Sequence, residues 1–218
     1  MTLSRMAIST LAAAGFVYAI HHHPLPPEFN SRLYLFQYLT FIDLWIQLIF
    51  HLLNVSVILL PKLKPLRDNL YALVAFPVGM FVSIVFWVIF LRDPAFMIPK
   101  DRPFIIPPSL NHLLHTLPAV GLLTHALTTT HKYPRSISKA FFSIGAIAFI
   151  YSLILLCIHL TYGHFPYPFM NMMKPNHLVL FIGISVLFLF ALYIVGLLIN
   201  ALTNRLYKSV NDKKQHQN

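Results

Sequence analysis

Charged side chains are scarce in this sequence. They make up 10% of its 218 residues, with 16 Lys and Arg against six Asp and Glu, whereas about 25% is usual in soluble domains. Hydrophobic residues account for 57%, and the mean hydropathy is +0.69. This much apolar surface cannot be buried inside one water-soluble domain of this length. The composition therefore excludes a soluble globular domain and a disordered chain.

Several familiar signatures are also missing. The single cysteine, Cys157, excludes an intramolecular disulfide framework and any site that needs several cysteines. The seven glycines form no phosphate-binding loop, and neither Gly-x-Ser-x-Gly nor His-Glu-x-x-His occurs. The sequence therefore lacks the local motifs of a phosphate-binding loop, a serine-hydrolase nucleophile elbow and a zinc protease.

Long apolar runs are what the chain does have. A helix that crosses a bilayer needs roughly 20 predominantly apolar residues. We predict an all-α polytopic membrane protein, a single six-span domain over residues 1–218. The spans are expected at about 3–20, 33–60, 70–91, 110–127, 140–160 and 178–202. The fourth run is the weakest because it carries three histidines, so we expect it to pack inside the bundle. The first run could instead be a cleaved signal peptide.

The basic residues orient these predicted spans. Eleven of the 16 Lys and Arg fall on the side of the N-terminus, the second and fourth loops and the tail. The positive-inside rule then places both termini in the cytosol. Because this accounts for the basic excess, no nucleic acid partner is expected. We predict a multi-pass protein of the endoplasmic reticulum, another endomembrane or the plasma membrane.

The second predicted span carries a polar stripe. A helical step of about 100° per residue places its members within a sector roughly 80° wide. They are Thr40, Asp43, Gln47, His51 and Asn54. Polar groups at membrane depth face the bundle interior or a wet cavity. Gln47 and Asn54 suit interhelical hydrogen bonds, whereas Asp43 is the only acid within a span.

The fourth span supplies a partner for this stripe, because Asn111, His112 and His115 share one helical face. The second and fourth spans both enter from the non-cytosolic side, which puts Thr40 and His115 each about 10 Å inside a helix end. A hydroxyl beside an imidazole is a minimal nucleophile and general base. Asp43 could orient its neighbours, and Asn111 or another side chain in the pocket could stabilise an oxyanion.

These residues resemble a known family, the androgen-induced and androgen-dependent tissue factor pathway inhibitor-regulating proteins. The resemblance runs along the chain through YLTFIDL with Gln47 (38–44), AFPVG (75–79), Phe86-Trp87, LNHLLHT (110–116) and YPF (167–169). It implies an integral-membrane threonine hydrolase that cleaves branched fatty acid esters of hydroxy fatty acids. By motif, the nucleophile falls on Thr40 and the histidine on His115. Lipids are then the expected partners, with no cofactor and no metal.

Three other interpretations stay open. Haem or a metal could bind among the span histidines His51, His115, His125 and His159. His21, His22 and His23 form a further metal-attracting tract in a loop. The polar stripe could also line the pathway of a transporter, or the protein could be a non-catalytic membrane scaffold.

Overall fold

The computed structural model describes residues 2–25, 30–98, 106–134 and 136–215, which form helices and no strands. In chain order the elements are α1 (Thr2–His22), the 3-10 helix η1 (Arg32–Gln37), α2 (Leu39–Leu59), the 3-10 helix η2 (Pro61–Leu63), α3 (Lys64–Leu70), the π-helical turn η3 (Tyr71–Ala75), α4 (Phe76–Arg92), the 3-10 helix η4 (Pro94–Phe96), α5 (Pro108–His115), α6 (Leu117–Thr128), α7 (Ile137–Tyr162), α8 (Pro168–Asn171) and α9 (Pro175–Gln215). The all-α prediction is confirmed for these residues.

In the described part of the chain, four helices are long and apolar enough to cross a membrane. They are Leu39–Leu59, Pro61–Arg92, Ile137–Tyr162 and Pro175–Ser209. Met6–His22, within α1, and Leu117–Thr128, which is α6, are shorter apolar stretches of the described residues and do not add to these four. A multi-pass membrane architecture follows, while the six-span count stays a prediction. Of the residues that oriented the predicted spans, Lys100, Arg102 and Arg135 lie outside the described residues.

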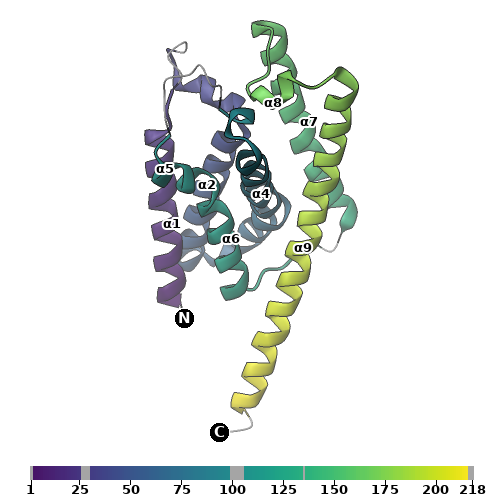
Figure 1. Cartoon of the computed structure of the whole chain (residues 1–218). Coiled ribbons are helices and arrows are strands. Elements are labelled where there is room, and N and C mark those ends of the chain that lie inside the picture. Colours follow the sequence, from purple (N-terminus) through teal and green to yellow (C-terminus); the bar gives the residue numbers. More distant parts are fainter. Residues whose placement is uncertain (1, 26–29, 99–105, 135, 216–218) are drawn as a thin grey trace.

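The helices form an elongated bundle in which α1 packs on α2, and α4 contacts α9 and α6 (Figure 1). The helices α7 and α9 lie together on one side of the bundle, with the short α8 at one end. Both chain ends point toward the opposite end, where α9 extends beyond its neighbours. The apolar core comprises clusters around Phe16, Tyr193 and Phe50.

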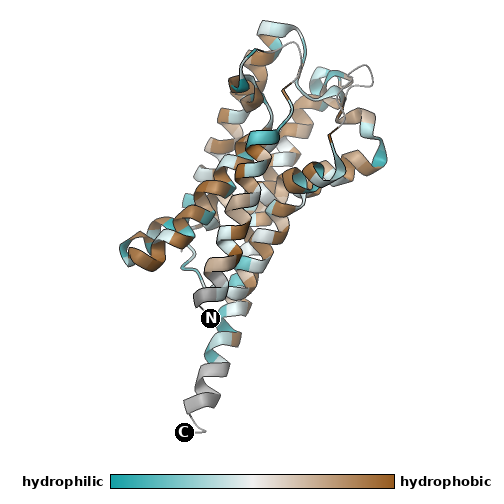
Figure 2. Ribbon diagram, turned by 90° about the vertical axis from the view of Figure 1, so that its left-hand side faces the viewer, coloured by the Kyte–Doolittle hydropathy of each residue, from teal (hydrophilic) through white to brown (hydrophobic). Residues whose placement is uncertain are grey.

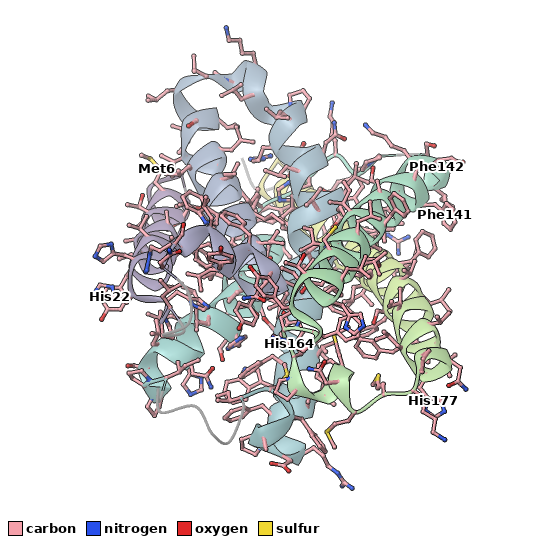
Figure 3. All side chains as sticks on the ribbon, turned by 90° about the horizontal axis from the view of Figure 1, so that it is seen from above. Met6, His22, Phe141, Phe142, His164 and His177 are labelled. Carbon is pink, nitrogen blue, oxygen red and sulfur yellow. The ribbon has the colours of Figure 1, made fainter. Side chains whose placement is uncertain are left out.

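Hydrophobic residues predominate along the helices, and hydrophilic residues lie mainly at the loops and ends (Figure 2). Phe141 and Phe142 of α7 project outward from the bundle (Figure 3) and are 59% and 72% exposed. Large exposed apolar side chains also run along α9, for example Leu187 at 71%. Surface of this kind is stable against lipid rather than water.

Two of the helix boundaries that differ from the sequence prediction have a clear local cause. The helix α2 begins at Leu39 rather than near residue 33, because Ser31 caps a separate 3-10 helix and Tyr38 is extended at φ −93° and ψ 125°. The predicted run 110–127 is broken at Thr116 into α5 and α6. Pro118 has no N–H for the carbonyl of Leu114, and its ring crowds that carbonyl.

Close helix packing depends on Gly79 in α4. A Cβ atom at this position would lie 2.5 Å from Gln47 Nε2 and 2.6 Å from a methyl carbon of Leu122. Glycine therefore lets α2 and α6 approach α4 closely. This contact fixes the polar stripe of α2 against the middle of the bundle.

Candidate active site

Thr40 and His115, which are 75 residues apart in sequence, meet in the structure. Thr40 Oγ1 lies 3.3 Å from His115 Nε2. Thr40 is the second residue of α2, and His115 is the last residue of α5. The predicted depth of about 10 Å for Thr40 is therefore wrong, because the chain before Leu39 belongs to a different helix. The predicted proximity of the two side chains is nevertheless observed.

The ring of His115 is held in one orientation. Its Nδ1 lies 2.8 Å from Asn111 Oδ1 and 3.2 Å from the Asn111 carbonyl oxygen. A carbonyl oxygen only accepts hydrogen bonds, so Nδ1 carries the proton and Nε2 of the neutral ring is free to accept one from Thr40. Phe86 stacks on the imidazole with a centroid separation of 3.3 Å and an interplanar angle of 2°. With its proton on Nδ1 and Nε2 unprotonated, His115 is in the tautomer that a general base for Thr40 requires.

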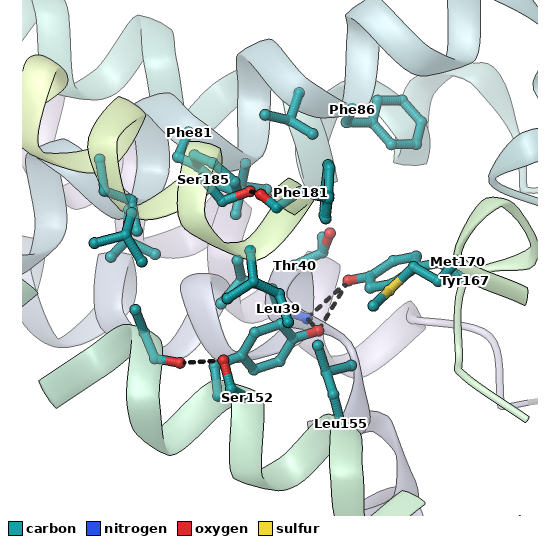
Figure 4. A pocket seen from close by; sticks show the side chains of 18 of the residues that line it. Leu39, Thr40, Phe81, Phe86, Ser152, Leu155, Tyr167, Met170, Phe181 and Ser185 are labelled. Atoms are coloured by element: carbon teal, nitrogen blue, oxygen red, sulfur yellow. Dashed lines mark hydrogen bonds between the residues drawn. The ribbon is translucent and has the colours of Figure 1, made fainter. Parts of the chain in front are cut away.

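Thr40 opens onto an apolar cavity of about 110 Å³ between α2, α4, α7, α8 and α9 (Figure 4). Of the described residues that line it, five carry hydroxyl groups: Thr40, Tyr151, Ser152, Tyr167 and Ser185. The remaining residues are hydrophobic, among them Phe81, Leu155, Met170 and Phe181. Such a lining suits a hydrocarbon chain with one polar point of attachment.

His23, just after α1, packs against the first turn of α2. The ring of His23 packs edge-on against Phe41, with centroids 5.4 Å apart. Burial lowers the pKa of His23 to about 4, and the positive charge of Arg32 lowers it further. His23 is therefore neutral at physiological pH. Arg32 itself donates hydrogen bonds to the carbonyl groups of Ile20, His21 and His23 and so caps the end of α1.

Two of the predicted supporting residues do not reach the pair. Asp43 is fully buried, but its carboxylate accepts a hydrogen bond from Gln47 Nε2 at 2.8 Å, one turn further into α2. His112 is exposed, and its Nδ1 lies 3.0 Å from Thr116 Oγ1. Asn111 does contact the pair, although its oxygen orients His115 rather than donating to a substrate.

The rest of the polar stripe is buried, as predicted, and some of it links helices. Asn54 donates to Ser9 at 2.7 Å and thereby joins α2 to α1. Gln47 also donates to the Ala75 carbonyl at 3.0 Å. The expected interhelical role of Gln47 and Asn54 is thus observed.

A second buried polar cluster lies elsewhere in the bundle. Asp68 Oδ1 is 2.6 Å from Arg67 Nη2 and 2.8 Å from His131 Nδ1. None of these three residues lines the cavity beside Thr40. No group of three or more His, Cys, Asp or Glu that could hold a metal ion occurs among residues 2–25, 30–98, 106–134 and 136–215.

Comparison with the sequences of known proteins places this chain in a family. A sequence model for FAR-17a/AIG1-like proteins matches residues 2–201. The chain belongs to the FAR-17a/AIG1-like family. The human androgen-induced gene 1 protein is 33% identical over 195 residues, which is 82% of either chain. The human androgen-dependent TFPI-regulating protein is 28% identical over 73% of either chain, and a UPF0641 membrane protein of Schizosaccharomyces pombe is 26% identical over 86% of either chain. No solved structure matches.

Sequence reasoning missed three aromatic residues of the site in this family member. They are Phe86, which stacks on His115, and the two tyrosines Tyr151 and Tyr167, whose hydroxyls bond to the first N–H of α2. Phe86 and Tyr167 lie in segments that carry the family resemblance, so the sequence could have indicated a role for both residues. Tyr151 lies in an apolar run without such a motif, so nothing in the sequence indicated its role.

Proposed function

We propose that this protein is an integral-membrane carboxylic ester hydrolase that cleaves fatty acid esters of hydroxy fatty acids, with Thr40 as nucleophile and His115 as general base. One observation carries the proposal. The hydroxyl of Thr40 lies 3.3 Å from an imidazole nitrogen that is free to accept its proton, and it opens onto an apolar cavity. The relatives' names describe androgen response and regulation of TFPI rather than a reaction. The choice of ester therefore rests on the resemblance in the motifs around these residues.

The geometry supports a two-step acyl transfer. His115 Nε2 takes the proton of Thr40 while Oγ1 attacks the ester carbonyl, and a tetrahedral oxyanion forms. As the C–O bond breaks, His115 returns the proton to the departing hydroxy fatty acid. Water then attacks the acyl-threonine with the same histidine as base, which releases the fatty acid and regenerates Thr40. A threonine hydroxyl is a weak nucleophile at its free pKa, so the base is essential.

The membrane arrangement forms part of the proposal. Six crossings with both termini in the cytosol agree with the two chain ends lying toward the same end of the bundle. Thr40, at the start of α2, then lies near the non-cytosolic end. An ester could reach the cavity sideways from the bilayer, between α7 and α9 on one side and α4 on the other.

Covalent labelling tests the proposal directly. A fluorophosphonate probe added to the purified protein in detergent should form an adduct on the peptide that contains Thr40, with loss of fluoride. His115→Ala should slow this labelling, and Thr40→Ala should abolish it. Equal labelling of the Thr40→Ala variant, or an adduct at another residue, contradicts the assignment. Transport or scaffolding would then account better for the polar stripe.

A further inference from the structure

The segment 167–169 contributes to the family resemblance but takes no part in the chemistry described so far. Tyr167 lies immediately before α8, and its side chain lines the same cavity as Thr40. Its hydroxyl end points toward Leu39 and Thr40 at the start of α2 (Figure 4). It therefore stands where an ester carbonyl would approach the nucleophile.

The start of α2 anchors this hydroxyl. The first N–H groups of a helix have no partner within the helix. The N–H of Leu39 donates instead to the Tyr167 oxygen at 2.9 Å and to the Tyr151 oxygen at 3.0 Å. An oxygen that accepts hydrogen bonds from a helix N-terminus becomes more polarised, which makes its own O–H a stronger donor.

The hydroxyl groups of the cavity differ in where their protons go. Ser152 and Ser185 donate to carbonyls of their own helices, each at 2.8 Å. Tyr151 donates to the Gln37 carbonyl at 3.0 Å, and Thr40 has His115. Among the described residues, the Tyr167 oxygen accepts hydrogen bonds from the Leu39 N–H at 2.9 Å and from the Tyr151 hydroxyl at 3.4 Å, a long O–H···O distance, and neither contact uses the proton of Tyr167.

Tyr167 also remains protonated at working pH. Burial raises the pKa of Tyr167 to about 12, although hydrogen bonds from Tyr151 and from the backbone of Leu39 and Thr40 oppose the rise. A phenol in this state donates a hydrogen bond and does not compete with His115 for the proton of Thr40. The hydrogen bond from the Leu39 N–H to its oxygen also fixes its position relative to the nucleophile.

We propose that Tyr167 is the oxyanion donor of the site. Its O–H, held by the N-terminus of α2 and without a close acceptor among the described residues, donates to the carbonyl oxygen of the ester as that oxygen gains negative charge. No proton is transferred in this contact, and the bond strengthens from the ester to the tetrahedral intermediate. The inference rests on the proposed ester hydrolysis and assigns the oxyanion contact to Tyr167 instead of Asn111.

The test compares Tyr167→Phe with Tyr151→Phe, since each removes one hydroxyl from the same Leu39 N–H. We expect Tyr167→Phe to lower kcat by about 10²- to 10³-fold with little change in KM, because removal of one oxyanion donor has that effect. Tyr151→Phe should lower kcat by much less, about tenfold at most, because its proton serves the Gln37 carbonyl rather than the ester. Thermal unfolding in detergent reports whether both variants fold.

The outcomes separate the two proposals. If Tyr167→Phe retains the parental kcat, or if both variants lose equal activity, the hydroxyls only support α2 and the oxyanion role is wrong. Thr40→Ala in the same assay gives the reference. Loss of activity in Thr40→Ala together with full activity in Tyr167→Phe overturns this inference alone. Full activity in Thr40→Ala overturns the proposed function.

Discussion

The protein contains two threonine–histidine pairs that look equivalent by distance. Thr40 lies 3.3 Å from His115, and Thr116 lies 3.0 Å from His112. Their surroundings differ. His115 is 5% exposed and oriented by Asn111, whereas His112 is exposed to the outside of the bundle. Of these four side chains, Thr40 is the one that lines the cavity.

Their hydrogen bonds also differ. The indole N–H of Trp87 donates to Thr116 Oγ1 at 3.1 Å, so this hydroxyl ties α4 to the break between α5 and α6. Thr40 Oγ1 has no such second partner in the described residues. A short hydroxyl–imidazole distance is therefore not sufficient evidence of a nucleophile. Access to a cavity and a base with a fixed tautomer distinguish the first pair from the second.

The largest expected effect is the loss of activity when the first pair is disrupted. Thr40→Ala and His115→Ala should each lower kcat/KM for ester hydrolysis by about 10³-fold or more, since members of such a pair act as a unit. Thr116→Ala and His112→Ala are matched controls and should stay within about threefold of the parent. Release of fatty acid from a defined ester, measured by mass spectrometry on equal amounts of folded protein, gives the comparison.

Loss of activity in Thr116→Ala and His112→Ala, with parental activity in the variants of Thr40 and His115, would assign the chemistry to the second pair. Equal losses in all four variants would instead point to a shared structural role around the α5–α6 break. Each variant therefore needs a thermal unfolding curve beside its rate.

A smaller effect is expected when Asn111 no longer orients His115. Asn111→Leu leaves only the backbone carbonyl at 3.2 Å to hold Nδ1. We expect kcat to fall about 10- to 100-fold, because a misplaced catalytic group costs up to about 10²-fold. Asn111→Asp retains an acceptor and should recover most of the activity.

The pH profile separates positioning from simple folding. A carboxylate at residue 111 would stabilise the protonated imidazole of His115, so the acid limb of kcat/KM should move to higher pH in Asn111→Asp. An unchanged profile, together with parental kcat in Asn111→Leu, would show that Asn111 does not orient the base.

Part of this site could be predicted from sequence. The spacing along α2 placed Asp43, Gln47 and Asn54 on a buried face, and the shared entry side of two helices brought Thr40 near His115. Apolar periodicity reports which face is buried, and it does so with little information about helix ends. The start of α2 at Leu39 depends on Ser31, which caps a separate 3-10 helix, and on the extended conformation of Tyr38. The residues from 33 onward are mostly apolar, so hydrophobicity alone does not reveal this boundary.

Other features depend on contacts between distant segments. Tyr167 reaches α2 across 128 residues, and Phe86 stacks on a ring 29 positions away. No local pattern specifies such contacts. The choice of partner for Asp43 was equally undetermined, since Thr40 and Gln47 both lie about one turn from it.

The smallest expected effect concerns Asp43, and it tests whether proximity in sequence to the nucleophile matters. Asp43→Asn keeps the oxygen that accepts from Gln47 and lies away from the Thr40–His115 contact. We expect kcat/KM to stay within about threefold of the parent, with an equal or higher Tm because a buried acid becomes a neutral amide.

Gln47→Leu is the matched variant for Asp43→Asn. It removes the donor to Asp43 and should destabilise the fold by about 1 to 3 kcal/mol while the rate per folded molecule is retained. A loss of about 30-fold or more in folded Asp43→Asn would show that Asp43 supports the Thr40–His115 pair, because displacement of a catalytic group by a neighbouring change has an effect of that size.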